Sequence, residues 1–356
     1  MKDQSKILFF HNQTIPWAEN NNNIWLASTL KLHRNIAKFK FPCKLDAEGR
    51  NQIISLIDGS AIQNKALSEA LLIRAKDMDP LEKELLYEHF LGSDAFHHAY
   101  SGEAFIIDRS GLFLASINIH DHLHLQLTNC NGELENSWNQ LVNIETKIGE
   151  TLDYAFNPKF GFLSTSPDNC GTGLIVKIFL HIPTLIFTSQ TEKLLEDKEK
   201  NSIISSDLQG NKKEFVADIM ILQNNCTLGL TSEDIISSLH STAMRFIVAE
   251  KSARAKVKQE NSSLMRDKIS RAFGLLTHSY RLEAKEALNA ISMCKLGMDL
   301  GWISGTNHEI FNKLFFFSRR AHLQIPSHYS SEELPQVRSE FIRSSLKDAQ
   351  LNLMSS

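Results

Sequence analysis

The sequence predicts an α+β protein, in which an antiparallel sheet flanked by helices is followed by an all-helical C-terminal domain. Three observations carry this prediction. Short β-rich runs alternate with turn residues between positions 104 and 127. Helix-period apolar residues lie on both sides of that region, and they continue from Gly229 almost to the C-terminus. A length of 356 residues favours two domains, and we place the boundary to give domains 1–253 and 254–356.

The N-terminal elements follow from local patterns. Residues 1–23 read as a loop that ends in four asparagines. Residues 67–90 carry apolar residues at helical spacing, with Lys and Glu between them. Within this segment, Asp79-Pro80 is typical of a helix cap followed by the first turn.

The middle of the chain has a different period. Residues 104–127 read as antiparallel strands, with a turn at 108–111. We expect a helix over 134–154 and another β-rich run over 174–187.

Helices account for the rest of the chain. Thr231 opens a capping signal, and the apolar residues of 235–247 then share one helical face. Further helices are predicted over 264–277 and 282–300.

Composition excludes several classes of protein. The chain is 42% hydrophobic and 22% charged, as is ordinary for a globular protein. Its net charge of -3 gives no bulk attraction to nucleic acid or to an acidic membrane surface. Five widely spaced cysteines without a CxxC pair indicate reduced thiols, and no stretch approaches the roughly 18 apolar residues that span a bilayer. We therefore expect a cytoplasmic protein that binds neither nucleic acid nor membranes.

Several runs match one family in order and spacing. Four of them are DYAF at 153–156, FGFL at 160–163, NCGTGL at 169–174 and LHIP at 180–183. In addition, ASTLKLHRN at 27–35 stands where the family has SSRIRLARN, and DHL at 121–123 stands where it has NEEDHLR. In these runs the chain resembles the McsB family of bacterial protein arginine kinases, in the ATP:guanido phosphotransferase superfamily. The resemblance implies the guanido kinase (phosphagen kinase) fold for the first domain and the family's helical domain for the second.

The catalytic positions of the motifs are changed in this chain. Phosphoryl transfer needs fixed cationic donors and a carboxylate that orients the guanidinium. The family's Arg positions hold Thr29, Lys31, His124, Ile175 and Ser206 in this chain. Its Glu positions hold Ile119, His120 and Asn211, and its Cys position holds Ser166. Because loss of one donor costs on the order of 10²–10³ in rate, we expect a pseudokinase with no catalytic residues and no cofactor.

Some features of a nucleotide site are retained. Gly171-Thr172-Gly173 is either a phosphate cradle made by backbone N–H groups or a tight turn that the fold requires. His89 matches a family histidine near the nucleotide, but a lone His beside an apolar face is also typical of a packed residue. With Lys31 and His124, these residues form the vestigial cofactor-binding set.

A metal site is the remaining chemical possibility. His120, His122 and His124 alternate along a predicted strand, so their side chains are expected on one face, and imidazole is a common zinc ligand. Alternate positions on one strand rarely bring three rings to one ion, and we therefore expect no metal.

Three functions compete. The first is an inactive scaffold or regulatory protein, a homodimer through its C-terminal helices; the resemblance implies a McsA-like zinc protein or a Clp-type chaperone as its partner. The alternative is a divergent, active protein arginine kinase that uses Mg-ATP with Lys31 and His124. A third is a nucleotide sensor that relies on the Gly171–Gly173 turn and His89.

Overall fold

The computed structural model describes residues 17, 22–63, 67, 69–92, 96, 98–130, 132–195, 202–208, 210–211, 214–327 and 329–352. The predicted loop over 1–23 lies mostly outside these residues. The chain divides into two compact units, whose described parts come from 27–177 and 223–240 in the first and from 17–26, 178–222 and 241–352 in the second. The predicted domain boundary at 253 falls inside a long helix, and it stays a prediction.

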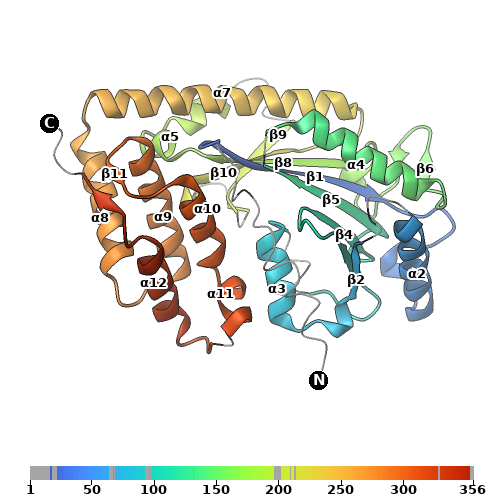
Figure 1. The fold of residues 1–356 in the computed structure, drawn as a ribbon. Coiled ribbons are helices and arrows are strands. Elements are labelled where there is room, and N and C mark those ends of the chain that lie inside the picture. The colour runs from blue at the N-terminus through green and yellow to red at the C-terminus, as the bar shows by residue number, and fades with distance from the viewer. Residues whose placement is uncertain are drawn as a thin grey trace. The chain divides into compact units, whose positions relative to one another are not determined.

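Eight strands of the described chain form one sheet, in the order β2-β3-β4-β5-β1-β8-β10-β9 (Figure 1). Their bounds are β1 (Trp25–Arg34), β2 (Leu71–Arg74), β3 (Ala104–Ile107), β4 (Phe113–Ile117), β5 (Leu123–Asn129), β8 (Leu174–His181), β9 (Ile203–Ser206) and β10 (Ile219–Asn224). From β2 to β1 each pairing is antiparallel. The predicted antiparallel sheet, including the three strands over 104–127, is confirmed.

The helices of the first half differ in part from the prediction. They are α2 (Ala47–Gln63), α3 (Pro80–His89) and α4 (Leu134–Gly149). The helix expected over 67–90 is wrong in its first part, where β2 lies. The cap is confirmed, because Asp79 accepts from the Glu82 N–H while the Glu82 side chain accepts from the Asp79 N–H.

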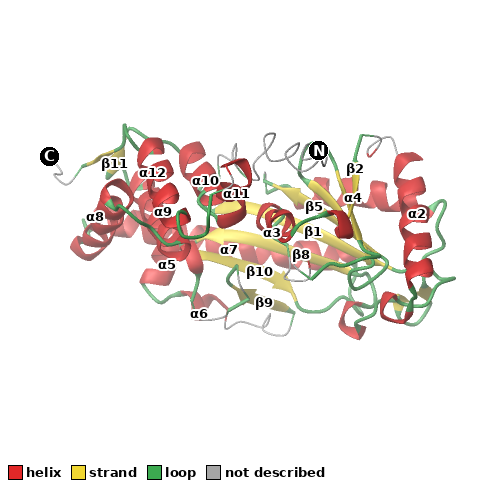
Figure 2. Cartoon of the chain, turned by 90° about the horizontal axis from the view of Figure 1, so that it is seen from below, coloured by secondary structure: helices red, strands yellow, loops and turns green. Residues whose placement is uncertain are grey.

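The run over 174–187 begins as the predicted strand, β8. It ends as α5 (Pro183–Phe187), which has a proline in its first turn. Shorter elements are β6 (Phe156–Asn157), β7 (Gly161–Phe162) and α6 (Thr191–Leu195). Figure 2 shows β1, β8 and β10 running side by side in the sheet.

The C-terminal part is helical, with one exception. Its helices are α7 (Ser232–Gln259), α8 (Ser263–His278), α9 (Ala284–Asp299), α10 (His308–Phe317), α11 (Arg320–Ser327) and α12 (Leu334–Ser345). Met265, Ile269, Leu296 and Phe311 are among the buried residues of their common core. The exception is a two-stranded pair, β11 (Ile303–Ser304) with β12 (Gln350–Leu351). The all-helical expectation is wrong in this detail. Within the described residues, no helix has the length and apolar character needed to cross a membrane.

One buried ion pair supports the end of β1. The Arg34 Nε donates to Glu145 Oε1 at 2.7 Å, from β1 to α4. The Arg34 Nη1 donates to the backbone oxygens of His33 and Thr172, and the guanidinium lies 3.5 Å from the centre of the Phe162 ring. The Arg34 guanidinium therefore joins the end of β1 both to α4 and to the turn that precedes β8.

Neutralising this pair on one side is expected to destabilise the protein. Glu145→Gln leaves the buried Arg34 charge uncompensated, which costs about 3 kcal/mol, measurable as the free energy of unfolding in urea. Lys38→Ala is the control, since the Lys38–Asp153 pair is largely exposed and such pairs contribute little. Equal effects from the two substitutions would contradict this account of Arg34.

Candidate functional site

A cavity of about 250 Å³ lies in the first unit, beside the central strands of the sheet. Six residues that stand at Arg or Glu positions of the family motifs line it: Thr29, Lys31, Ile119, His120, His124 and Ile175. The remaining lining residues are His33, Leu91, Phe96, Gln126, Asn169, Lys177 and Gln223. The structure therefore gathers six sequence-predicted site positions around one space. Ser206 and Asn211 belong to the second unit.

Strand geometry explains why these side chains converge. Alternate residues of a strand point to the same face. Three neighbouring strands each contribute such residues: Thr29, Lys31 and His33 from β1, His124 and Gln126 from β5, and Ile175 and Lys177 from β8. In the antiparallel register His33 lies directly opposite His124, and their ring centres are 4.2 Å apart.

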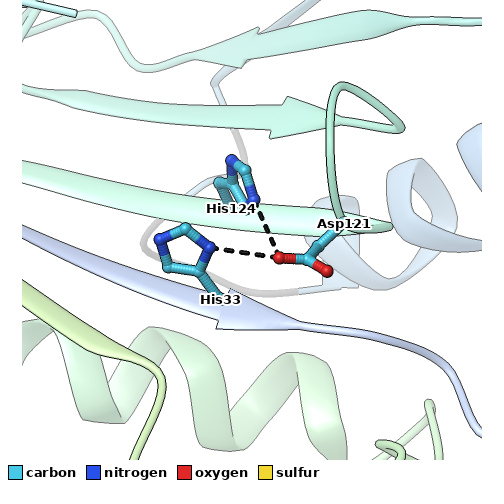
Figure 3. Close-up of side chains that lie close together, drawn as sticks. All are labelled: His33, Asp121 and His124. Carbon is cyan, nitrogen blue, oxygen red and sulfur yellow. Dashed lines mark hydrogen bonds and ion pairs between the residues drawn. The ribbon is translucent and has the colours of Figure 1, made fainter. Parts of the chain in front are cut away.

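The carboxylate of Asp121 holds this region together (Figure 3). Its Oδ2 lies 3.1 Å from His33 Nδ1 and 3.3 Å from His124 Nε2, and it accepts from Ser164 Oγ at 2.9 Å. Its Oδ1 accepts from Asn35 Nδ2 and from the Thr165 N–H, each at 2.7 Å. Five contacts thus surround one buried carboxylate.

The charges of this cluster follow from burial and bonding. Burial opposes ionisation of Asp121, but the bonds from His124 and His33 outweigh it and hold the pKa of the carboxyl well below its usual range. Burial lowers the pKa of His124 to about 3, and it also lowers the pKa of His33. Near neutral pH the cluster is one carboxylate with two neutral imidazoles.

Two lysines supply the cationic groups of the cavity. Burial, and then the charge of Lys177, lower the pKa of Lys31 to about 7. Burial also lowers the pKa of Lys177. Lys31 is therefore only partly charged near pH 7, and the cavity is weakly cationic.

Groups for phosphoryl transfer are missing from the lining. Among the residues that the structure describes around the cavity, none is an arginine and none carries a carboxylate. The nearby Arg34 is engaged with Glu145 and two backbone oxygens. Asp121 is not among the lining residues, and its two carboxylate oxygens are engaged in the five contacts described above.

The Gly171–Gly173 segment is a structural turn. The Gly171 N–H donates to Phe162 O, and the Thr172 N–H donates to Thr227 O. Gly171 has a φ of +107°, and a Cβ there would lie 2.3 Å from the Thr227 oxygen. The glycine is thus required by the close approach of backbone to backbone, and two of the three N–H groups of this turn are already used.

Two further predicted residues lie away from the cavity lining. His89 is buried, with its Nε2 2.9 Å from Gly111 O. Ser166 precedes a short 3-10 helix (Pro167–Asn169), and its N–H contacts Ser164 Oγ. Both residues therefore make contacts within the fold and are absent from the cavity lining.

The expected common face of the three histidines is wrong. His122 accepts from the Ile36 N–H through Nδ1, and its Nε2 lies 2.8 Å from Lys40 O, whereas His124 faces Asp121. β5 begins only at Leu123, so the alternation of a strand does not extend back to His120. Sequence reasoning missed His33, Asp121 and Lys177; the alternation of Lys31 and His33 on one strand was the available signal.

Comparison with known proteins gives family matches over most of the chain. Residues 52–253 match the model of the ATP:guanido phosphotransferase C-terminal catalytic domain, and residues 262–355 match that of the protein-arginine kinase McsB C-terminal domain. A protein-arginine kinase of Chlamydia pneumoniae is 41% identical over 306 residues, covering 85% of each chain. One of Chlamydia muridarum is 34% identical, covering 88% of this chain and 89% of the relative. One of Bacillus subtilis is 28% identical, covering 93% of this chain and 91% of the relative.

Solved structures share the fold. Lombricine kinase aligns with a TM-score of 0.58 at 17% identity, covering 69% of this chain and 74% of that one. The duplicated taurocyamine kinase of Schistosoma mansoni with bound transition-state analogue components also aligns with a TM-score of 0.58, at 20% identity. The match covers 78% of this chain and 41% of that one. The guanido kinase fold expected from the sequence is thus confirmed.

The depressed pKa of Lys31 has a consequence for stability. A group whose pKa is lower in the folded state binds fewer protons there than in the unfolded chain, so the free energy of unfolding rises with pH between about 7 and 10. Lys31→Met is expected to remove this contribution, at most about 1.4 kcal/mol per pH unit. Urea unfolding at pH 7 and pH 9 measures it: the advantage of Lys31→Met over the unchanged protein should be larger at pH 7. If the difference in the free energy of unfolding between Lys31→Met and the unchanged protein is as large at pH 9 as at pH 7, the lowered pKa of Lys31 is refuted.

Proposed function

Because the chain belongs to the McsB family of protein-arginine kinases, we propose that it has kept the family's fold and lost phosphoryl transfer, and that it acts as a scaffold or regulatory protein. The observation that carries this proposal is the lining of the cavity. At the positions where the family motifs place arginine and glutamate, the described lining has threonine, lysine, histidine and isoleucine.

The electrostatic demand of the reaction supports this proposal. A transferring phosphoryl group spreads negative charge over its oxygens. Catalysis consists mostly of stabilising that charge with donors held in fixed positions. Ile175 neither donates nor carries charge. Burial disfavours the charge of both Lys31 and Lys177, and Lys177 disfavours that of Lys31 further. The two lysines therefore supply less positive charge than two arginines would.

The second requirement concerns the proton. A guanidinium stays protonated near neutral pH, so a carboxylate must orient it and accept its proton. The two motif glutamates are replaced by Ile119 and His120. The volume of about 250 Å³ is also below the roughly 300–1,000 Å³ usual for small-molecule sites.

The proposal predicts no phosphoryl transfer. The chain is incubated with Mg-ATP carrying a labelled γ-phosphate and with an arginine-rich protein, and acid-labile label is counted. The Bacillus subtilis relative, assayed in parallel, is the positive control. We expect label at background, and no heat on titration of Mg-ATP at micromolar protein. Label above background that scales with the amount of chain would overturn the proposal.

The relatives favour a second candidate function. Proteins 41% and 34% identical to this chain are named protein-arginine kinases, and an active enzyme would bind Mg-ATP with Lys31, Lys177 and His124 facing its phosphates. In that case Lys31→Ala abolishes label transfer, while Lys313→Ala, a change to an exposed ion pair of α10, leaves it intact. Transfer with this pattern would establish the kinase.

The proposed role requires contacts with other proteins. From the family resemblance, we propose a homodimer through the C-terminal helices and a partner such as a McsA-like zinc protein or a Clp-type chaperone. Light scattering during size exclusion tests the dimer, for which a mass near twice 40.3 kDa is expected. A monomer at all concentrations would remove that part of the proposal.

A further inference from the structure

We propose that His33, Asp121 and His124 form a binding site for one divalent transition-metal ion of the zinc class. The three side chains come from the β1–β5 pair and the bend that precedes β5 (Figure 3). Each offers one ligand atom, and these atoms all lie within 4.8 Å of one another. This inference concerns only the cluster itself, and it holds whether or not the chain transfers phosphate.

The distances fit a metal centre. Zinc bonds to histidine nitrogen and carboxylate oxygen are about 2.0–2.2 Å long, and a tetrahedral arrangement then separates neighbouring ligand atoms by about 3.3 Å. Asp121 Oδ2 lies 3.1 Å from His33 Nδ1 and 3.3 Å from His124 Nε2. Both nitrogens face the same oxygen, so small movements of the rings place an ion between the three atoms.

Hydrogen bonding alone accounts poorly for the cluster. A carboxylate offers about four lone-pair positions, yet five groups surround Asp121: His33, His124, Ser164, Asn35 and the Thr165 N–H. In addition, His33 Nε2 is buried and has no hydrogen-bond partner among the described residues. If a cation takes the place of the two N–H groups that face Oδ2, with the proton of each ring carried on its other nitrogen, Oδ2 keeps one hydrogen bond and the crowding is removed.

The supporting contacts are those of a metal ligand. Ligating carboxylates are usually oriented by hydrogen bonds to the oxygen that does not bind the ion. Asn35 Nδ2 and the Thr165 N–H hold Oδ1 in this way, each at 2.7 Å, and Oδ2 is thereby directed at both rings.

The surroundings decide the class of ion. Two imidazoles and one carboxylate suit zinc and its neighbours, whereas magnesium and calcium prefer oxygen ligands throughout. His33 and His124 line the cavity, which leaves a further coordination position for water or a small anion.

Metal titration of the tag-free full chain tests the site, with Zn²⁺ as the probe and Co²⁺ as the spectroscopic one. We expect one equivalent of Zn²⁺, and a cobalt spectrum without a thiolate band, which separates this site from the five cysteines. His33→Ala and His124→Ala should each weaken binding by at least about tenfold. His278→Ala, a change to an exposed histidine at the end of α8, is the matched control.

Circular dichroism verifies that each variant is folded. The proposal is overturned if the folded chain binds less than one equivalent, if the cobalt spectrum shows thiolate coordination, or if His33→Ala and His124→Ala bind as the His278→Ala control does.

Discussion

The carboxylate of Asp121 is the group on which the site depends. An ionised carboxylate that is buried without partners costs several kcal/mol, and here five contacts offset that cost. They come from β1 and the residue that follows it, from the start of β5 and from the segment at 164–165, which are far apart in the sequence. The same bonds that stabilise the charge therefore fix the wall of the cavity. Asp121 thus holds this wall in place directly beside the positions where the family motif has its glutamates.

The character of the cavity depends on replacing arginine by other basic residues. A guanidinium keeps its charge in any protein environment and binds phosphate oxygens with a planar fork. An ammonium group loses its proton when burial and a second cation disfavour it, as Lys31 does beside Lys177. A lysine at a motif arginine is therefore not a conservative change here. It gives a cavity whose positive charge weakens in the pH range where a kinase works.

The sequence shows the parts of the fold that local pattern controls. The strands over 104–127 are short apolar runs separated by turn residues, and Asp79 caps α3 through groups three residues apart. β2 was predicted as helix because three adjacent apolar residues fit either period. The site positions in β1, β5 and β8 were identified because they lie inside motif runs. The Asp121 cluster was not, because His33 lies 88 residues away and the contact depends on the β1–β5 register, which no local pattern reveals.

That register also connects two replacements that look independent in the sequence. At the positions of His33 and His124 the family motifs have alanine and arginine, and in the structure these positions are direct partners across two strands. Alanine leaves room for a long guanidinium that carries its own charge. Two facing imidazoles on one carboxylate fill that room with groups that are neutral by themselves. The charge at this point of the cavity then depends on what the imidazoles hold, a proton or a metal ion. At this point of the cavity a side chain that is always charged is thus replaced by two that are charged only through what they bind.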